Sequence, residues 1–240
     1  MARTAVSSLA HAHLNAFAEL VHKHQPARAL AQFSKYLDAQ PQDVVSANAF
    51  HYVTHAVGEE ASEELLQRAN HAKSQINACN AQLAAFAKAK LSNRVIVAHP
   101  LDALSAPFLT SAKSVRFLNA NPSALHDFPL SKLEAHKPLA ATQALDNADM
   151  LLLEPRAITP EGVVVERGGR LLAELASARG IPVYVLGTSW HASPSWKASR
   201  TEEFVPATAL TGILSEHGIY AHKEFLGRVE KTFPWLLTSP

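Results

Sequence analysis

The stretch LLLEPRAITPEGVVVERGGRLLAEL, residues 151–175, decides the fold class of this chain. It starts with an apolar run, continues through a charged segment that holds proline and glycine, and ends in a helical pattern that opens on Gly168-Gly169. A buried strand that leads into a helix is the repeating unit of α/β proteins with parallel sheets. Ligands of such sheets bind beyond the carboxyl ends of the strands, so the segment after this strand is the first place to look for a site.

The rest of residues 93–240 repeats the same alternation. Short apolar runs rich in β-branched residues predict strands buried on both faces, and they occupy 94–99, 114–119, 137–142, 149–154 and 182–187. Helical patterns follow several of them, at 101–113, 130–135 and 168–179. The closing segment predicts a short strand near 212–214, a turn at Gly218 and a last helix. Together these patterns predict a Rossmann-like, mostly parallel, doubly wound sheet.

Residues 1–92 have a different composition, rich in alanine and nearly free of glycine, with apolar residues at helical spacing. A break at 39–43 ends one helix, and Asp43 is expected to cap the next. Residues 59–90 contain neither proline nor glycine and predict one helix of about 45 Å. We therefore expect an all-α N-terminal domain over 1–92 that ends in a long connecting helix, and a Rossmann-like domain over 93–240.

Composition narrows the classes of partner and cofactor. The 240 residues carry a formal net charge of +1 without a basic stripe, so no direct contact with nucleic acid is expected. No run approaches the roughly 20 apolar residues that cross a bilayer, and we expect a soluble, cytoplasmic protein with no membrane contact. The single cysteine, Cys79, excludes an intramolecular disulfide.

Thirteen histidines raise the question of a metal, with candidates at 11–13, 22–24 and 51–55. His51 and His55 share a helix face, but no His-Glu-x-x-His arrangement accompanies them. We therefore expect no metal and no other cofactor.

Three segments, in this order and spacing, resemble one protein family. They are VIVAHPLDALSAPFL at 95–109, NADMLLLEPRAITPEGVVVERGGRLLAELASARGIPVYVLGTSWHASPSWK at 147–197, and FVPATALTGILSEHGI at 204–219. The family comprises the alpha, beta and delta subunits of eukaryotic initiation factor 2B, ribose-1,5-bisphosphate isomerase and methylthioribose-1-phosphate isomerase. The resemblance covers about residues 59–230 and implies a helical domain before a Rossmann-like domain, with pairing of subunits into dimers.

The resemblance also implies where chemistry would take place. The isomerases carry a cysteine in the loop after the first strand and an aspartate at the end of the strand equivalent to 149–154, and these move a proton between C1 and C2 of a sugar phosphate. Here the loop reads AHPLDAL, without a thiol, and the family's Gly-Ala-Asp reads Glu154-Pro155-Arg156. Arginine does not lose its proton in proteins and cannot act as the base. The remaining candidates for catalytic groups are His99, Asp102 and Glu154.

Basic residues and glycines near the central helix favour binding of an anion. Gly168 and Gly169 at a helix start would leave N–H groups free, and Arg156, Arg167 and Arg170 add positive charge. The alternative is a tight turn with solvated arginines.

The later loop GTSWHASPSWK, residues 187–197, adds Trp190 and Lys197, which suit contact with a ligand or partner. The alternative for its tryptophans is that they cover the sheet edge or a dimer contact.

Three hypotheses for function follow. The first is a non-catalytic, initiation factor 2B subunit-like binder of a phosphorylated sugar or nucleotide that acts through oligomerisation, with a homodimer expected. The second is an aldose–ketose isomerase of sugar phosphates that uses substitute catalytic residues. The third is a structural subunit of a larger assembly, without a ligand.

Overall fold

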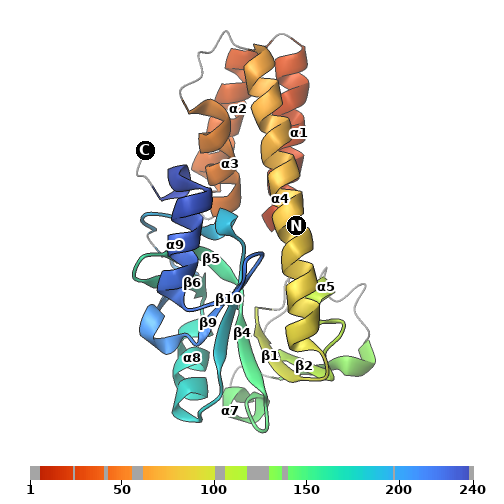
Figure 1. Ribbon diagram of the computed structural model, residues 1–240, viewed down its shortest axis with the longest axis vertical. Coiled ribbons are helices and arrows are strands. Elements are labelled where there is room, and N and C mark those ends of the chain that lie inside the picture. The colour runs from red at the N-terminus through yellow and green to blue at the C-terminus, as the bar shows by residue number, and fades with distance from the viewer. Residues whose placement is uncertain are drawn as a thin grey trace.

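The computed structural model describes residues 6–23, 25–40, 43–55, 62–100, 106–117, 130–136, 140–196 and 198–237. Helices form one end of the molecule and a sheet with its covering helices forms the other, and helix α4 runs between the two ends (Figure 1). None of the helices in these ranges is both long and apolar enough to span a membrane.

The helical end contains α1 (Val6–His22), α2 (Pro26–Ala39), α3 (Val44–Thr54) and the first half of α4 (Ser62–Leu91). The expected cap of α3 is confirmed, since the Asp43 side chain accepts a hydrogen bond from the Ser46 backbone N–H at 3.0 Å. Apolar side chains at helical spacing form the core here, with Leu14, Phe17 and Phe33 among the buried residues. The long helix expected over 59–90 is observed as the uninterrupted α4.

A seven-stranded sheet forms the other end, in the order β10-β9-β7-β4-β1-β2-β3. All neighbours are parallel except β10 and β9. Its strands are β1 (Val95–His99), β2 (Ser114–Phe117), β3 (Leu133–Ala135), β4 (Met150–Leu153), β7 (Val183–Leu186), β9 (Gly212–Ser215) and β10 (Gly218–Tyr220). In chain order the six parallel strands lie 3-2-1-4-5-6, the Rossmann order, so the sheet changes direction of growth between β1 and β4. The predicted fold class is confirmed.

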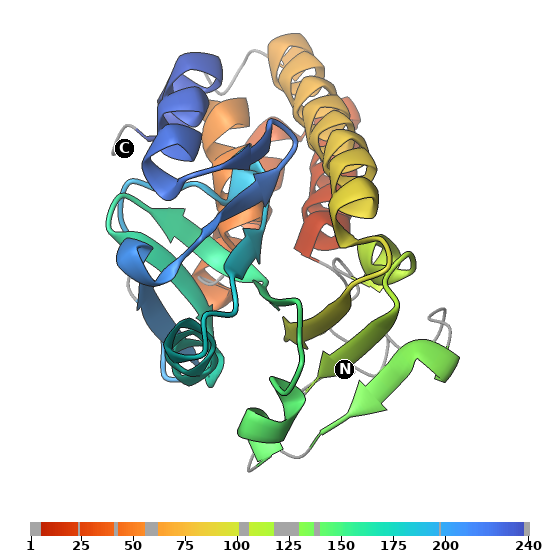
Figure 2. The ribbon, with the colours of Figure 1, turned by 60° about the horizontal axis from the view of Figure 1, so that its bottom comes forward.

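Helices cover both faces of this sheet (Figure 2). One face packs against the second half of α4 and the short α5 (Ala106–Leu109), through Leu83, Leu91 and Leu109. The opposite face packs against α7 (Ala141–Ala144), α8 (Gly169–Ala178) and α9 (His222–Thr232). The first half of α4 belongs to the helical core and its second half to the sheet core, so one helix joins the two. The expectation that 1–92 and 93–240 are separate domains stays a prediction.

A second, three-stranded antiparallel sheet takes two of its strands from residues 151–175 and the third from a later segment. It contains β5 (Pro155–Thr159), β6 (Gly162–Glu166) and β8 (Glu202–Pro206), in the order β5-β6-β8. The residues between the apolar strand and helix α8 are therefore a hairpin that turns at 160–161, where Thr159 pairs with Gly162. This hairpin was not anticipated from the sequence.

Two predicted elements are wrong. A strand was expected over 137–142, but its described part, residues 140–142, lies at the start of the helical turn α7, because alanine favours helix and the run is too short to pair. Residues 130–135 were expected to be helical; the first three form the short 3₁₀ helix η1 (Leu130–Lys132), but β3 forms over the last three and pairs with β2. Pairing with an existing strand edge outweighs helix propensity in so short a segment. Of the helix expected over 101–113, α5 is the part the structure describes, and 101–105 lie outside the described residues.

Candidate binding site at the carboxyl ends of the strands

The change in strand order between β1 and β4 brings two predicted residues together. His99 is the last residue of β1, Glu154 follows β4, and the Glu154 N–H donates to the His99 carbonyl at 3.1 Å. Both side chains are buried, with 4% and 5% of their surfaces exposed. Asp102, the third candidate for catalysis, lies outside the described residues.

His99 is held as a neutral ring with one free acceptor. Its Nε2 lies 3.0 Å from the Arg167 carbonyl oxygen, which only accepts, so Nε2 carries the proton. Burial lowers the pKa of His99, and the ring is neutral near pH 7. Nδ1 is then an acceptor, and it has no hydrogen-bond partner among the described residues.

Gly168 and Gly169 give the His99 ring its space. A Cβ atom at either glycine would lie 3.4–3.5 Å from ring atoms, and one at Gly169 would also lie 2.5 Å from Val165 Cγ2. Gly168 adopts a φ of 96°, in the left-handed region that favours glycine, and it caps α8. The pair of glycines therefore allows the end of β6, helix α8 and His99 to approach closely.

His191 is the second buried histidine at the strand ends, and its strand β7 lies two positions from β1 in the sheet. It follows β7 in the short helix η3 (Ser189–His191), and its Nδ1 accepts a hydrogen bond from the Thr188 N–H at 3.1 Å. Burial, with a smaller effect of the Arg156 charge, lowers the pKa of His191 to about 4. Nε2 therefore carries the proton of a neutral ring, and this buried donor has no partner among the described residues.

Glu216 directly follows β9, the last of the parallel strands on this side of the sheet. Its carboxylate accepts a hydrogen bond from the Ser189 N–H at 2.9 Å, and it is 4% exposed. Cys79, from α4, lies beside it: burial, then the negative charge of Glu216, raise the pKa of the thiol, which stays protonated. The long helix thus brings the single cysteine of the sequence to the strand ends, although it precedes the sheet in the chain.

The groups predicted to bind an anion are engaged with acidic side chains. Arg156 forms an ion pair with Glu166 at 3.0 Å, and Arg170 pairs with Glu174 at 2.8 Å. The N-terminus of α8 faces Glu203 of β8, whose Oε2 accepts from the N–H groups of Gly168 at 2.9 Å and Arg170 at 3.3 Å.

Arg167 is exposed. Ligand binding by these residues stays a prediction, and a ligand at this helix end has to displace a carboxylate.

Trp190 does not present its ring to solvent. It is 1% exposed and packs between the helical end and the C-terminal segment, with its ring centroid 5.4 Å from that of Trp235 and 6.1 Å from that of Phe233. Asn48 of α3 holds the loop by donating to the Trp190 carbonyl at 2.8 Å and the Ala192 carbonyl at 2.9 Å. The ring therefore fills a core between elements, which neither sequence-based alternative described. Lys197 lies outside the described residues.

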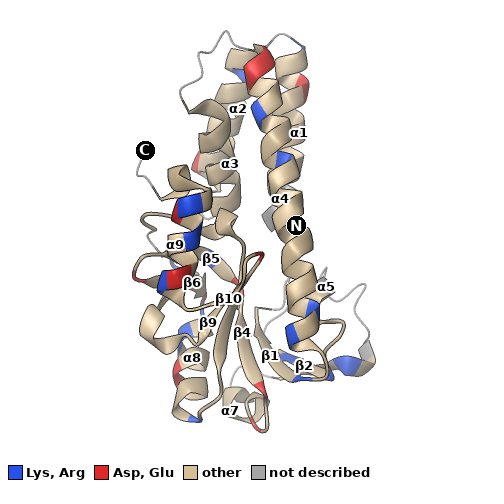
Figure 3. Ribbon diagram, viewed as in Figure 1, with Lys and Arg blue, Asp and Glu red and all other residues tan. Residues whose placement is uncertain are grey.

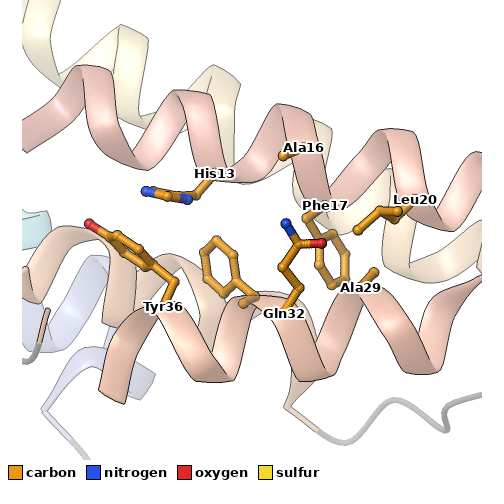
Figure 4. A pocket seen from close by; sticks show the side chains of 8 residues that line it. His13, Ala16, Phe17, Leu20, Ala29, Gln32 and Tyr36 are labelled. Carbon is orange, nitrogen blue, oxygen red and sulfur yellow. The ribbon is translucent and has the colours of Figure 1, made fainter. Parts of the chain in front are cut away.

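Away from the strand ends, the distribution of charge and the hollow between α1 and α2 do not indicate a particular ligand. Figure 3 shows basic and acidic residues scattered over both ends and mixed along α9. A hollow of about 210 Å³ between α1 and α2 has apolar walls, and His13 and Tyr36 lie near each other at one end of it (Figure 4). The Tyr36 hydroxyl already donates to Asp43 at 2.8 Å. Within the described ranges, no group of three or more His, Cys, Asp or Glu side chains is arranged to hold a metal ion.

No family model and no curated protein matches the chain. Solved structures do match its fold. The translation initiation factor eIF-2B of Pyrococcus horikoshii OT3 is similar with a TM-score of 0.76 and 16% identity, over 91% of this chain and 92% of that one. The tetrameric eIF2B-beta2-delta2 complex of C. thermophilum gives 0.71 and 15%, over 95% and 89%. The 5-methylthioribose 1-phosphate isomerase of P. horikoshii OT3 gives 0.69 and 13%, over 94% and 83%. The family resemblance seen in the sequence is thus confirmed for the fold.

Proposed function

We propose that this protein is a non-catalytic, initiation factor 2B subunit-like binder of a phosphorylated sugar or nucleotide, and that it acts in the cytoplasm through oligomerisation. One observation carries the proposal. The ends of β1 and β7 present a buried acceptor, His99 Nδ1, and a buried donor, His191 Nε2, and neither has a partner among the described residues. Buried polar atoms in proteins are nearly always hydrogen-bonded, so atoms of this kind indicate a polar ligand or water beside each of them.

Sugar hydroxyls fit this pair of histidines. A hydroxyl group both donates and accepts, so a hydroxyl beside each ring would satisfy His99 Nδ1 or His191 Nε2–H without a change of charge. The phosphate would need positive charge nearby. Arg156 supplies it at the edge of the same site, as does the start of α8 if Glu203 turns away.

The absence of the family's isomerisation is supported by the same groups. Arg156 stands at the position that the resemblance assigns to the catalytic aspartate, and it is paired with Glu166. The lowered pKa values of His99 and His191 make weak bases of both rings, whereas an efficient general base has a pKa near the working pH. Glu154 lies two residues before the aspartate position, a displacement of about 6–7 Å along a strand.

Oligomerisation is supported by exposed apolar side chains on the sheet end. Leu171 of α8 is 56% exposed and Ile219 of the edge strand β10 is 40% exposed. A C. thermophilum relative in fold forms a tetrameric beta2-delta2 complex. For this chain we propose a homodimer. Light scattering is expected to give about twice the chain mass of 25.9 kDa, and a mass of one chain at micromolar concentration would contradict it.

Calorimetric titration with ribose 1,5-bisphosphate, methylthioribose 1-phosphate and nucleoside monophosphates tests the binding. We expect at least one to bind, and His191→Asn, which keeps the acceptor toward Thr188 but removes the Nε2 donor, to weaken it. His22→Asn, at the exposed end of α1, is the matched control. Turnover of either isomerase substrate, followed by NMR, would support the isomerase hypothesis instead.

The hypothesis of a ligand-free structural subunit is favoured by one observation, the Glu203 carboxylate at the start of α8. It predicts that no phosphate ester binds, even after Glu203 is replaced. The same titration with Glu203→Ala therefore separates it from the first proposal.

A further inference from the structure

A second hollow lies where the C-terminal segment crosses the helical end, and the strand-end site does not account for it. Its volume is about 300 Å³. Four aromatic residues line it, one from α3, one from η3 and two at the C-terminal end: Tyr52, Trp190, Phe233 and Trp235. A smaller neighbouring hollow of about 240 Å³ shares Tyr52 and Trp235 with it. The two adjoining hollows form an aromatic-walled groove.

The rings at this place are arranged for contact with a flat molecule. Tyr52 and Trp235 lie 5.2 Å apart at 41°, and Tyr52 and His71 lie 5.8 Å apart at 33°. These two pairs are tilted, whereas Trp190 meets Tyr52 edge-on at 82° and Phe233 meets Trp235 edge-on at 82°. Tyr52 and Trp235 remain half-buried, so part of each ring is accessible in the hollow. Aromatic faces bind bases by stacking without regard to sequence, because every base has a π-face.

Polar groups at the hollow provide both donors and acceptors. Gln75 of α4 contributes an amide, Thr232 of α9 a hydroxyl, and His71 an imidazole. Gln75 is half-buried and Thr232 is exposed, so both residues are accessible at the hollow. An amide has two donors and one acceptor oxygen, which matches the mixed donor and acceptor edge of a nucleobase.

Charge at the groove is unfavourable for a cation. None of the described residues that line the two hollows is acidic, and Arg68 lines the smaller hollow of about 240 Å³. Arg68 is already held by Glu64 at 2.8 Å and by the His55 carbonyl at 2.6 Å, so it is not a free partner for a phosphate. An uncharged ring is therefore the best match. The volume is at the lower limit of about 300–1,000 Å³ for ligand sites, which suits one ring system and not a whole nucleotide.

We propose that this hollow binds the planar base of a nucleoside, with stacking on Tyr52 and Trp235 and hydrogen bonds from Gln75 and Thr232. The site is separate from the strand-end site and does not depend on the function proposed for that site. It takes the base alone, so an uncharged nucleoside is sufficient for binding.

Intrinsic fluorescence gives a direct measurement. Two of the chain's three tryptophans line the hollow, so titration with adenosine, guanosine, cytidine or uridine, excited where nucleosides do not absorb, is expected to change the emission for at least one of them. Calorimetry provides the dissociation constant. No binding by any of the four, up to their solubility limits, would overturn the proposal.

Variants assign the binding to the hollow. Gln75→Leu keeps the shape of the side chain and is expected to weaken binding roughly 2- to 10-fold, through loss of hydrogen bonds. Trp235→Leu is expected to weaken it roughly tenfold, through loss of stacking. Phe86→Ala, an aromatic residue of α4 that is 46% exposed and does not line the hollow, is the matched control and is expected to have no effect.

Two further outcomes would contradict the proposal. One is nucleoside affinity unchanged in both Gln75→Leu and Trp235→Leu. The other is a change in the mass of the oligomer in Trp235→Leu, together with no nucleoside binding by the wild type, which would assign the groove to contact with another chain. His191→Asn should leave nucleoside binding unchanged, so a failure of the strand-end proposal is distinguishable from a failure of this one.

Discussion

Glu203 is expected to control both the stability of α8 and the affinity of its N-terminus for anions. Its carboxylate accepts hydrogen bonds from the Gly168 N–H at 2.9 Å and the Arg170 N–H at 3.3 Å. The first distance is that of a good hydrogen bond and the second of a weak one. A capping side chain contributes about 1 kcal/mol, and a carboxylate at a partly buried helix start contributes up to about 2 kcal/mol.

These two contributions describe the same contact, so they do not add. Glu203→Ala is therefore expected to lower the free energy of unfolding by about 1–2 kcal/mol. Because Val165 and Glu203 pair through backbone atoms in the β6–β8 ladder, the strand itself is retained. The same substitution leaves the N–H groups open to an external anion, and affinity for inorganic phosphate should rise roughly 5- to 30-fold, the same free energy expressed as a ratio.

Urea unfolding measures the first effect and calorimetry the second. Glu230→Ala, which removes a carboxylate from the exposed side of α9, is the control for net charge. Equal urea midpoints for the two variants would refute the capping contribution. A destabilised Glu203→Ala whose phosphate affinity matches wild type would refute the competition between the carboxylate and an external anion.

Three other predictions concern stability. His191 has a pKa of about 4 in the folded protein, against 6.5 for an unperturbed histidine, so between these pH values only the unfolded state binds its proton. The free energy of unfolding is therefore fully present above about pH 6.5 and falls by about 3 kcal/mol as the pH drops to 4. In unfolding curves measured at several pH values, His191→Asn should reduce this loss. Gly169→Ala places a Cβ 2.5 Å from Val165 Cγ2 and should lower the free energy of unfolding by about 1–3 kcal/mol. Gly227→Ala in α9 has no atom within 4 Å of the new Cβ and should not destabilise the protein. Equal thermal midpoints for the two variants would contradict this. Ala78→Pro in the middle of α4 should cost about 3 kcal/mol or more and Ala78→Gly about 1 kcal/mol, and a loss of only a few tenths for proline would show that the helix is not continuous there.

The sequence was sufficient for the elements whose signal is local. The buried strands β1, β4 and β7 are unbroken apolar runs, and α4 lacks helix-breaking residues over its whole length. The segments that were misassigned, around β3 and α7, are only three and four residues long. In such short pieces the neighbouring strand decides the structure, and composition carries little information about the neighbour.

The site divides in the same way. His99 and Glu154 were found because each is the last residue of a predicted strand, and the ends of adjacent parallel strands meet. Glu203 was missed, since it reaches Gly168 across 35 residues through the pairing of β8 with β6. The partnership of Cys79 with Glu216 was missed because it depends on how α4 packs over the sheet. His99 and His191 both carry the proton on Nε2, and this tautomer depends on a carbonyl in one case and an N–H in the other, whose positions only the folded backbone defines.

Helix α4 also determines how the molecule comes apart. Its first half supplies buried side chains to the helical core and its second half to the sheet core, so a break anywhere near its middle exposes apolar surface in both. Cleavage within α4 is therefore expected to disrupt both cores and not to release two independently stable fragments. Amides along α4 should be protected from hydrogen exchange by a single opening event that involves most of the chain. A rotation or shift imposed on the helical end by a bound subunit would be transmitted to the strand ends through a rod, without an intervening hinge.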